Sequence, residues 1–176
     1  MMEKKTKIVI DADVIIHFLK GGYLSLLHKI FPEYQYVILD IVLNKELRKH
    51  RDTRIAIDNH LNYCKYIQIE KWNPNNEMIK EFAYLSTKYG LGESASMVYC
   101  KYNQDVIASS NITEITNYCN TNNITYVTTM DFLWTAYITK KMTETECNDF
   151  ISKVLSAKSK LPVKRITDYT PREICL

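Results

Sequence analysis

The amino-acid sequence predicts an α/β fold, a three-layer α/β/α sandwich with a mainly parallel central sheet. Short apolar runs such as Ile8-Val9-Ile10 and Tyr36-Val37-Ile38-Leu39 are typical of strands buried on both faces of a parallel sheet. Stretches with apolar residues at helical spacing alternate with these runs, as in successive βαβ units. The 176 residues are 46% hydrophobic and 24% charged, which is enough for one core without disulfides.

The expected elements follow in order from the amino terminus. We expect strands at residues 8–10, 36–39, 66–69, 105–109 and 124–127. We expect helices at residues 14–18, 23–30, 41–50, 77–89, 93–102, 112–120, 132–140 and 144–157. Residues 55–66 are ambiguous, and Asp40 is placed to cap the helix after the second strand. The chain divides into a domain over residues 1–161 and a tail over 162–176.

Composition excludes several classes of protein. The four glycines, at positions 21, 22, 90 and 92, cannot form the phosphate-binding loop of P-loop NTPases. The five cysteines form no CxxC pair, which argues against zinc ribbons and disulfide frameworks. The first apolar run is too short for a signal peptide, and no later run is long enough for a membrane span, so we expect a reduced, cytoplasmic protein without membrane contact. The net charge of +3 does not by itself indicate nucleic-acid binding.

Acidic side chains gather where the strands of such a sheet would end. Asp11 and Asp13 follow the first strand, Glu46 lies in the helix after the second, and Glu93 follows a Gly90-Leu91-Gly92 turn. Ligands of open parallel sheets bind beyond the carboxyl ends of the strands. Carboxylates crowded there repel one another unless a cation neutralises them. The sequence therefore predicts a Mg²⁺ or Mn²⁺ site, suited to hydrolysis of a phosphodiester by metal-activated water.

Each acid also has a simpler interpretation. Asp13 can cap a helix, Glu46 can be a solvated surface residue, and Glu93 can favour the dipole at its helix terminus. Asp11 is the hardest to explain in this way. It follows three β-branched residues, where burial of a carboxylate costs several kcal/mol unless the group is paired or coordinated.

The order of these residues resembles the PIN-domain family of metal-dependent ribonucleases, which includes the toxins of many bacterial toxin–antitoxin pairs. Asp11 matches the first acid of the family's opening strand, and Asp13 stands where Asn is commoner. Glu46 falls on the glutamate of the second motif, and Glu93 on the glutamate of a Gly-Glu-x-x-Ala segment. The resemblance covers roughly residues 8–160 and rests on these motifs taken together.

One acid of the family pattern is missing. The fourth strand ends in Ser109-Ser110-Asn111, where members of the family usually carry one or two aspartates. The resemblance implies that Asp11, Glu46 and Glu93 hold the metal, with Ser110 and Asn111 completing the shell. We expect Asp131, after the neighbouring strand, to take over part of the catalytic role of the missing acid. A helix N-cap is the alternative for Asp131.

The resemblance also implies a substrate and partners. The expected function is metal-dependent hydrolysis of single-stranded RNA, with a toxin-like role and an antitoxin-like protein partner as further expectations. The tail over residues 162–176 is expected to serve a homodimer or a partner. Basic side chains that can contact the phosphate backbone are Arg48, Arg51, Lys164 and Arg165, for which a solvated face is the alternative. The competing functions are a catalytically weakened PIN-like domain that binds RNA or protein, and a flavodoxin-like domain for small molecules.

Overall fold

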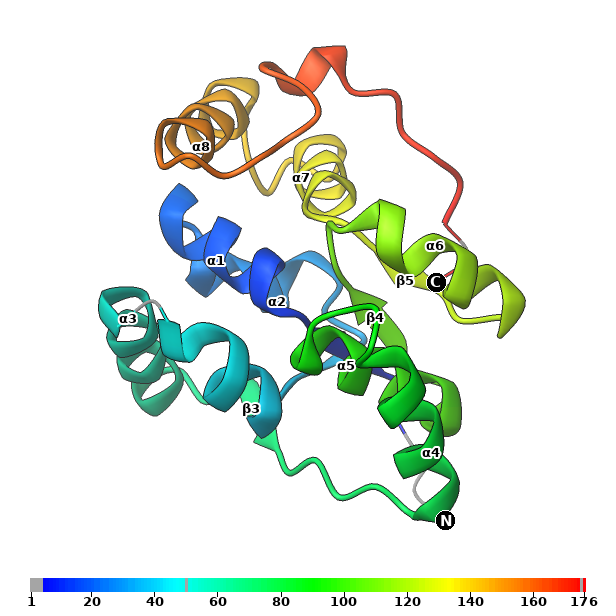
Figure 1. Ribbon diagram of the computed structural model, residues 1–176. Helices are drawn as coiled ribbons and strands as arrows, with labels where there is room; N and C mark the ends of the chain where they lie inside the picture. The colour runs from blue at the N-terminus through cyan, green and yellow to red at the C-terminus, as the bar shows by residue number, and fades with distance from the viewer. Residues whose placement is uncertain (1–4, 50, 175) are drawn as a thin grey trace.

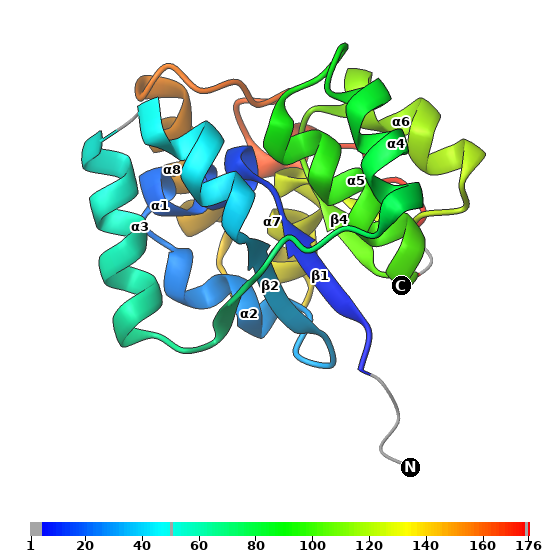
Figure 2. The ribbon, with the colours of Figure 1, turned by 60° about the horizontal axis from the view of Figure 1, so that its bottom comes forward.

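A five-stranded parallel sheet forms the middle layer of the computed structural model, which describes residues 5–49, 51–174 and 176. The strand order is β3-β2-β1-β4-β5, and every neighbouring pair is parallel. The strands are β1 (Lys7–Ile10), β2 (Gln35–Leu39), β3 (Ile67–Glu70), β4 (Val106–Ala108) and β5 (Tyr126–Val127). Helices cover both faces (Figures 1 and 2), so the predicted three-layer α/β/α fold class is confirmed.

The helices divide between the two faces of the sheet. Helices α1 and α2 lie with α7 and α8 on one face, whereas α4 and α5 lie on the other, where α5 contacts β1, β2 and β4 (Figure 1). Helix α6 packs beside α5, and α3 packs against α1. The helix bounds are α1 Ala12–Gly21, α2 Leu27–Ile30, α3 Arg51–Tyr63, α4 Asn76–Leu85, α5 Leu91–Asn103, α6 Ile112–Thr121, α7 Thr129–Ile138 and α8 Glu144–Ser156. Short 3-10 turns lie at Leu24–Leu26 (η1), Leu47–Lys49 (η3) and Ile166–Asp168 (η4), and a π-helical turn lies at Val42–Glu46 (η2).

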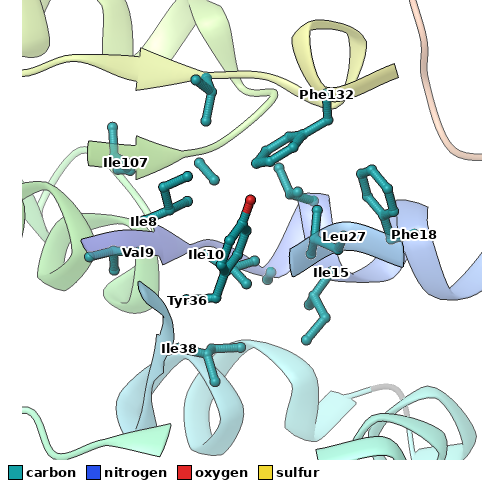
Figure 3. Close-up of a cluster of buried hydrophobic side chains, with 14 of the residues drawn as sticks. Ile8, Val9, Ile10, Ile15, Phe18, Leu27, Tyr36, Ile38, Ile107 and Phe132 are labelled. Atoms are coloured by element: carbon teal, nitrogen blue, oxygen red, sulfur yellow. The ribbon is translucent and has the colours of Figure 1, made fainter. Parts of the chain in front are cut away.

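The hydrophobic core is built on the central strand. All three apolar residues of β1 that the sequence singled out, Ile8, Val9 and Ile10, are completely buried, as expected for a strand with helices on both faces (Figure 3). On the α1 face, the ring of Phe18 packs edge-on against Phe132, with centroids 5.7 Å apart. This packing fixes α1 relative to the sheet, and α1 begins directly after Asp11.

Several predicted elements differ from the observed ones. The helix expected at residues 41–50 is instead the π-helical and 3-10 pair η2 and η3, as far as Lys49. Asp40 does not cap it, because its carboxylate accepts a hydrogen bond from the backbone N–H of Trp72 at 2.8 Å. The ambiguous stretch 55–66 belongs largely to α3. Helix α7 begins three residues earlier than expected, because Thr128 and Asp131 form a capping box at its start.

The tail over residues 162–176 packs on the domain in its described part. Ile166 is completely buried, and its backbone N–H donates to the side chain of Asn148 in α8 at 2.8 Å. Farther along, Tyr169 and Arg172 bind a side chain of α7. In the part of the chain that the structure describes, every helix is too short or too polar to cross a membrane.

Candidate functional site

An acidic pocket lies where the strand order of the sheet reverses. Strand β1 pairs with β2 on one side and β4 on the other, so the crevice between the carboxyl ends of β1 and β4 is the topological switch point. A pocket of about 370 Å³ opens here. Of the ten residues that line it, five are acidic and none is Lys or Arg. The acidic ones are Asp11, Asp13, Glu46, Glu93 and Glu114, hereafter the acidic cluster.

Asp11 is the most strongly buried of these acids, with 4% of its surface exposed. It follows β1 directly, and its backbone N–H donates to the carbonyl of Ala108 in β4 at 2.9 Å. Its Oδ1 atom is buried without a hydrogen-bond partner. Burial raises the pKa of Asp11 well above its usual range, and the charges of Asp13 and Glu46 raise it further. The site therefore favours a proton, or another positive charge, on this carboxylate.

Asp13 connects the first turn of α1 to the end of β4. Its Oδ2 accepts a hydrogen bond from the backbone N–H of Ser110 at 2.7 Å, and its Oδ1 accepts from the N–H of Val14 at 2.6 Å. Burial raises the pKa of Asp13 to about 6, although these two N–H groups lower it. Asp13 is therefore not a simple cap, since the N-cap position of α1 belongs to Asp11.

Glu46 reaches the cluster because two glycines leave room for its carboxylate. Its Oε1 accepts a hydrogen bond from the backbone N–H of Glu93 at 3.0 Å, in the first turn of α5. A Cβ atom at Gly92 would lie 2.6 Å from Cδ of Glu46, and one at Gly90 would lie 2.6 Å from Oε1. The turn expected at residues 90–92 is wrong, because α5 already begins at Leu91. The two glycines instead allow the Glu46 side chain to approach the first turn of α5 closely.

A hydrogen bond joins the carboxyl groups of Glu93 and Glu114. Burial raises the pKa of Glu93 to about 10, helped by its hydrogen bond with Glu114 and by the charge of Asp11. The same hydrogen bond lowers the pKa of Glu114. Glu93 is therefore the donor and Glu114 the ionised acceptor, while the Oε1 atom of Glu93 stays buried without a partner.

Glu114 was not among the residues that the sequence singled out. It lies in the first turn of α6, three residues after Asn111, and so supplies negative charge from the segment where the expected aspartate is missing. The sequence pattern that could have identified Glu114 is an acidic residue in the first turn of a helix that directly follows a buried strand. Such a residue projects toward the carboxyl end of the sheet, because that is where the helix begins.

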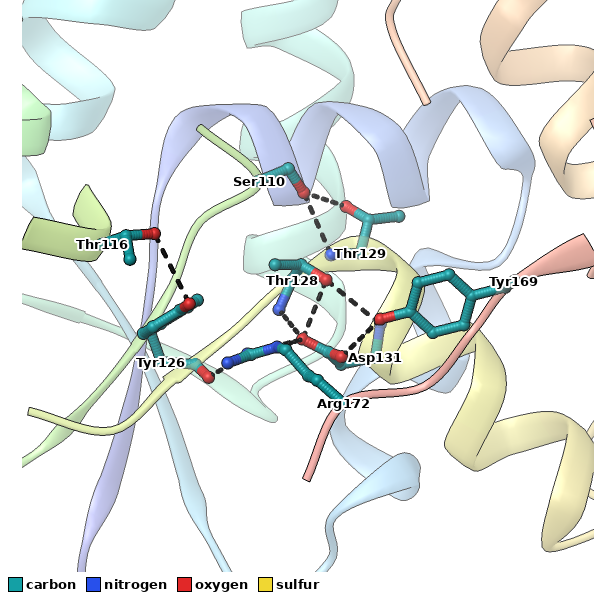
Figure 4. Close-up of polar contacts among 8 residues, drawn as sticks. All are labelled: Ser110, Thr116, Tyr126, Thr128, Thr129, Asp131, Tyr169 and Arg172. Carbon is teal, nitrogen blue, oxygen red and sulfur yellow. Dashed lines mark hydrogen bonds and ion pairs between the residues drawn. The ribbon is translucent and has the colours of Figure 1, made fainter. Parts of the chain in front are cut away.

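Ser110 and Asn111 take different positions around the cluster. Asn111 lines the acidic pocket, and a hydrogen bond from its side chain helps to lower the pKa of Glu114. Ser110 contributes only its backbone N–H to Asp13. The hydroxyl of Ser110 is used elsewhere, in hydrogen bonds to Oγ1 of Thr129 at 2.9 Å and from its backbone N–H at 3.0 Å (Figure 4).

Asp131 does not join the acidic cluster. Its carboxylate is almost completely buried and accepts hydrogen bonds from the N–H and hydroxyl of Thr128, the hydroxyl of Tyr169 and the guanidinium of Arg172 (Figure 4). The ion pair with Arg172 has an N–O distance of 2.7 Å. The N-cap of α7 is Thr128, so Asp131 is the third helical residue of a capping box and a link to the tail.

The four basic residues proposed for RNA contact lie outside the lining of the acidic pocket. Arg48 is exposed in η3, directly after Leu47, which does line the pocket, and Arg51 is exposed at the start of α3. Lys164 and Arg165 are exposed in the tail, where Arg165 pairs with Glu144 of α8 at 3.3 Å. Arg48 is thus the one of the four that stands next in sequence to the pocket wall.

The donor set of the cluster fits a hard divalent cation. Carboxylate oxygens are the preferred ligands of Mg²⁺ and Mn²⁺, and two of them, on Asp11 and Glu93, are buried without partners. Within residues 5–49, 51–174 and 176, however, no three His, Cys, Asp or Glu side chains are arranged to hold an ion together. Binding therefore requires the proton between Glu93 and Glu114 to leave and the carboxylates to turn toward one point.

Comparisons with family models, with curated proteins and with solved structures found no match for this chain. The assignment of a function therefore depends on the geometry and chemistry of the site.

Proposed function

We propose that this protein is a divalent-cation-dependent ribonuclease that hydrolyses RNA phosphodiester bonds, with a PIN-like arrangement of its acids. The observation that supports this proposal most is the acidic pocket at the switch point of the sheet. Five carboxylates line it without a basic side chain, and two buried carboxylate oxygens have no partner. Such a cluster is unfavourable unless protons or a cation neutralise it.

The acids have separate parts in this proposal. Asp11, Glu46 and Glu93 would hold the ion, which supplies Lewis-acid activation of water and of the scissile phosphate when bound. Asp13 is kept in place by the backbone N–H groups of Ser110 and Val14, so it orients the pocket wall. Glu114 accepts a hydrogen bond from the protonated Glu93 in the ion-free protein, and this proton must leave before Glu93 can act as a ligand.

RNA is the proposed substrate because of the sequence resemblance, and one exposed basic residue stands next to the pocket wall. Arg48 is exposed beside the pocket wall and can contact the phosphate backbone. The amide of Asn111 lines the pocket and can donate to a phosphate oxygen. A toxin-like role, a homodimer and an antitoxin-like partner stay predictions from the sequence.

A PIN-like domain that binds RNA or protein without cutting is the second candidate. One observation favours it: among the described residues, no three acidic, His or Cys side chains are arranged to hold an ion together. Burial also raises the pKa of Glu93, which favours a proton on this carboxylate. An ion must displace that proton, which weakens its affinity.

Thermal unfolding with and without Mn²⁺, together with cleavage of a single-stranded RNA, tests the proposal. We expect the midpoint temperature to rise by roughly 5–10 °C at an ion concentration about a hundredfold above the dissociation constant. Asp11→Asn should lose both the rise and the cleavage. The matched control is Asp149→Asn, because Asp149 is half exposed in α8 and pairs with Lys153 at 2.7 Å, away from the acidic pocket.

Each outcome distinguishes the candidates. Stabilisation by Mn²⁺ without RNA cleavage favours the binding domain over the nuclease. Cleavage of a single-stranded DNA of the same sequence at an equal rate contradicts the assignment to RNA. If Mn²⁺ neither stabilises the protein nor supports cleavage, and Asp11→Asn behaves like Asp149→Asn, the ion-dependent function is wrong.

A further inference from the structure

A second pocket, of about 300 Å³, adjoins the acidic pocket across the turn between β4 and α6. Ser110 lines this second pocket, and the next residue, Asn111, lines the acidic one. Its walls are mainly the apolar side chains Ile112, Met130, Leu161 and Pro162. We refer to it as the tail pocket, because the tail segment at Lys160–Pro162 supplies one of its walls.

A chain of hydrogen bonds fixes the tail pocket relative to the acids. The backbone N–H of Ser110 donates to Asp13 at 2.7 Å, while its hydroxyl donates to Oγ1 of Thr129 at 2.9 Å. Oγ1 of Thr129 in turn contacts Nδ1 of the buried His17 in α1 at 2.9 Å. Burial, with the nearby charge of Lys20, lowers the pKa of His17 to about 4. The imidazole of His17 is therefore neutral near pH 7, as are the side chains of Ser110 and Thr129.

The lining of the tail pocket suits a flat, mainly apolar ligand with a polar edge. Apolar walls accept the faces of an aromatic ring, and Lys160, exposed in the lining, can attract a neighbouring phosphate. The other cation of the pocket, Arg172, is held by Asp131. A nucleobase joined to a phosphate has this combination of properties.

We infer that the tail pocket binds the base of a nucleotide adjacent to the phosphodiester that the acidic cluster would cleave. This inference rests on the proposed ribonuclease function, since the adjacent acids give the bound nucleotide its role. The occupant is a segment of single-stranded RNA, because a base that is paired in a duplex cannot leave its stack without cost.

Adenine should bind the tail pocket more tightly than uracil, because its two-ring face covers more of the apolar walls. The hydroxyl of Ser110 lies in the lining, where it is already hydrogen-bonded to Oγ1 of Thr129 at 2.9 Å and to the backbone N–H of Thr129 at 3.0 Å. We expect oligoadenylate to bind about fivefold more tightly than oligouridylate, as the difference in stacked area allows.

Fluorescence anisotropy with labelled oligoadenylate and oligouridylate, without added metal, tests the pocket directly. Ile112→Trp fills the pocket from an exposed position, so the fold should tolerate it. We expect this variant to abolish the preference for oligoadenylate and to keep the stabilisation by Mn²⁺ seen in the unmodified protein. The matched control is Ile79→Trp on α4, because Ile79 is 47% exposed and Ile112 is 48% exposed. Lys160→Ala should weaken both oligonucleotides alike, with Lys80→Ala, on exposed α4 surface, as its control.

The outcomes separate this inference from the proposed function. Equal binding of the two oligonucleotides, or a preference that survives Ile112→Trp, overturns the base-binding pocket. If the preference is present and is lost in Ile112→Trp while Mn²⁺-dependent cleavage is absent, base binding by the tail pocket is supported and the proposed ribonuclease function is wrong. If cleavage requires Mn²⁺ but Ile112→Trp cleaves both oligonucleotides as the unmodified protein does, the nuclease stands and the pocket is wrong.

Discussion

Replacing Gly92 by alanine should displace the carboxylate of Glu46 and lower the stability of the fold only modestly. The new Cβ would lie 2.6 Å from Cδ of Glu46 and 2.8 and 3.0 Å from its two carboxylate oxygens, so the carboxylate must move away. Its hydrogen bond from the N–H of Glu93 is then lost, at a cost of about 1.5–3 kcal/mol for a charged acceptor. Alanine favours the helix over glycine by about 0.5–1 kcal/mol. The expected net loss is about 1–2 kcal/mol, or a fall of about 2–8 °C in midpoint temperature.

Thermal unfolding of Gly92→Ala with and without Mn²⁺ measures both effects. We expect the stabilisation by Mn²⁺ to fall much more than the stability of the ion-free protein, because Glu46 is displaced from the cluster. In a Glu46→Ala background the clash disappears, so Gly92→Ala should there become neutral or stabilising, by up to about 1 kcal/mol. A Gly92→Ala protein that responds to Mn²⁺ as the unmodified protein does would refute the assignment of Glu46 to the site.

Three further predictions concern the buried acids. Because the pKa of Glu93 is raised from 4.5 to about 10 in the folded protein, the folded state holds this proton over that range and the unfolded state does not. Stability should therefore fall as pH rises from about 4.5 to 10, and Glu93→Gln should flatten this decline in urea unfolding experiments. The stabilisation by Mn²⁺ should be larger at pH 8 than at pH 5.5, because the ion competes with protons on Asp11 and Glu93; equal midpoint shifts at both pH values would contradict this. Asp131→Asn should cost about 3 kcal/mol by calorimetry and leave the Mn²⁺ response intact, whereas loss of that response would restore Asp131 to the site.

The central strand and its acid were predictable from sequence for a physical reason. Three consecutive β-branched residues are typical of a strand buried on both faces, and this pattern predicted that Asp11 stands at the end of such a strand. The alternation of strands and helices then defined the layers, and the positions of the carboxyl ends followed from parallel pairing.

The remainder of the site depends on contacts between distant segments, which local pattern does not encode. Glu46 and its partner Glu93 in the first turn of α5 are 47 residues apart. In the sequence, the only trace of this contact is the pair Gly90 and Gly92, whose role the local pattern does not explain. Glu114 resembled any acidic residue that favours a helix terminus. Asp131 was misplaced because its partners Tyr169 and Arg172 lie about 40 residues later, in a segment without strong periodicity.

The first turn of α7 depends on the last described part of the chain, because that part supplies the partners of Asp131. Tyr169 and Arg172 donate to a carboxylate that is 2% exposed, and Arg172 also stacks on the ring of Tyr126 at 3.9 Å from its centroid. A protease cut before Tyr169 would leave a negative charge inside the protein with only Thr128 beside it. The trimmed protein should then be destabilised by roughly 3–5 kcal/mol at neutral pH, because removing the partner of a buried ion pair leaves an uncompensated charge.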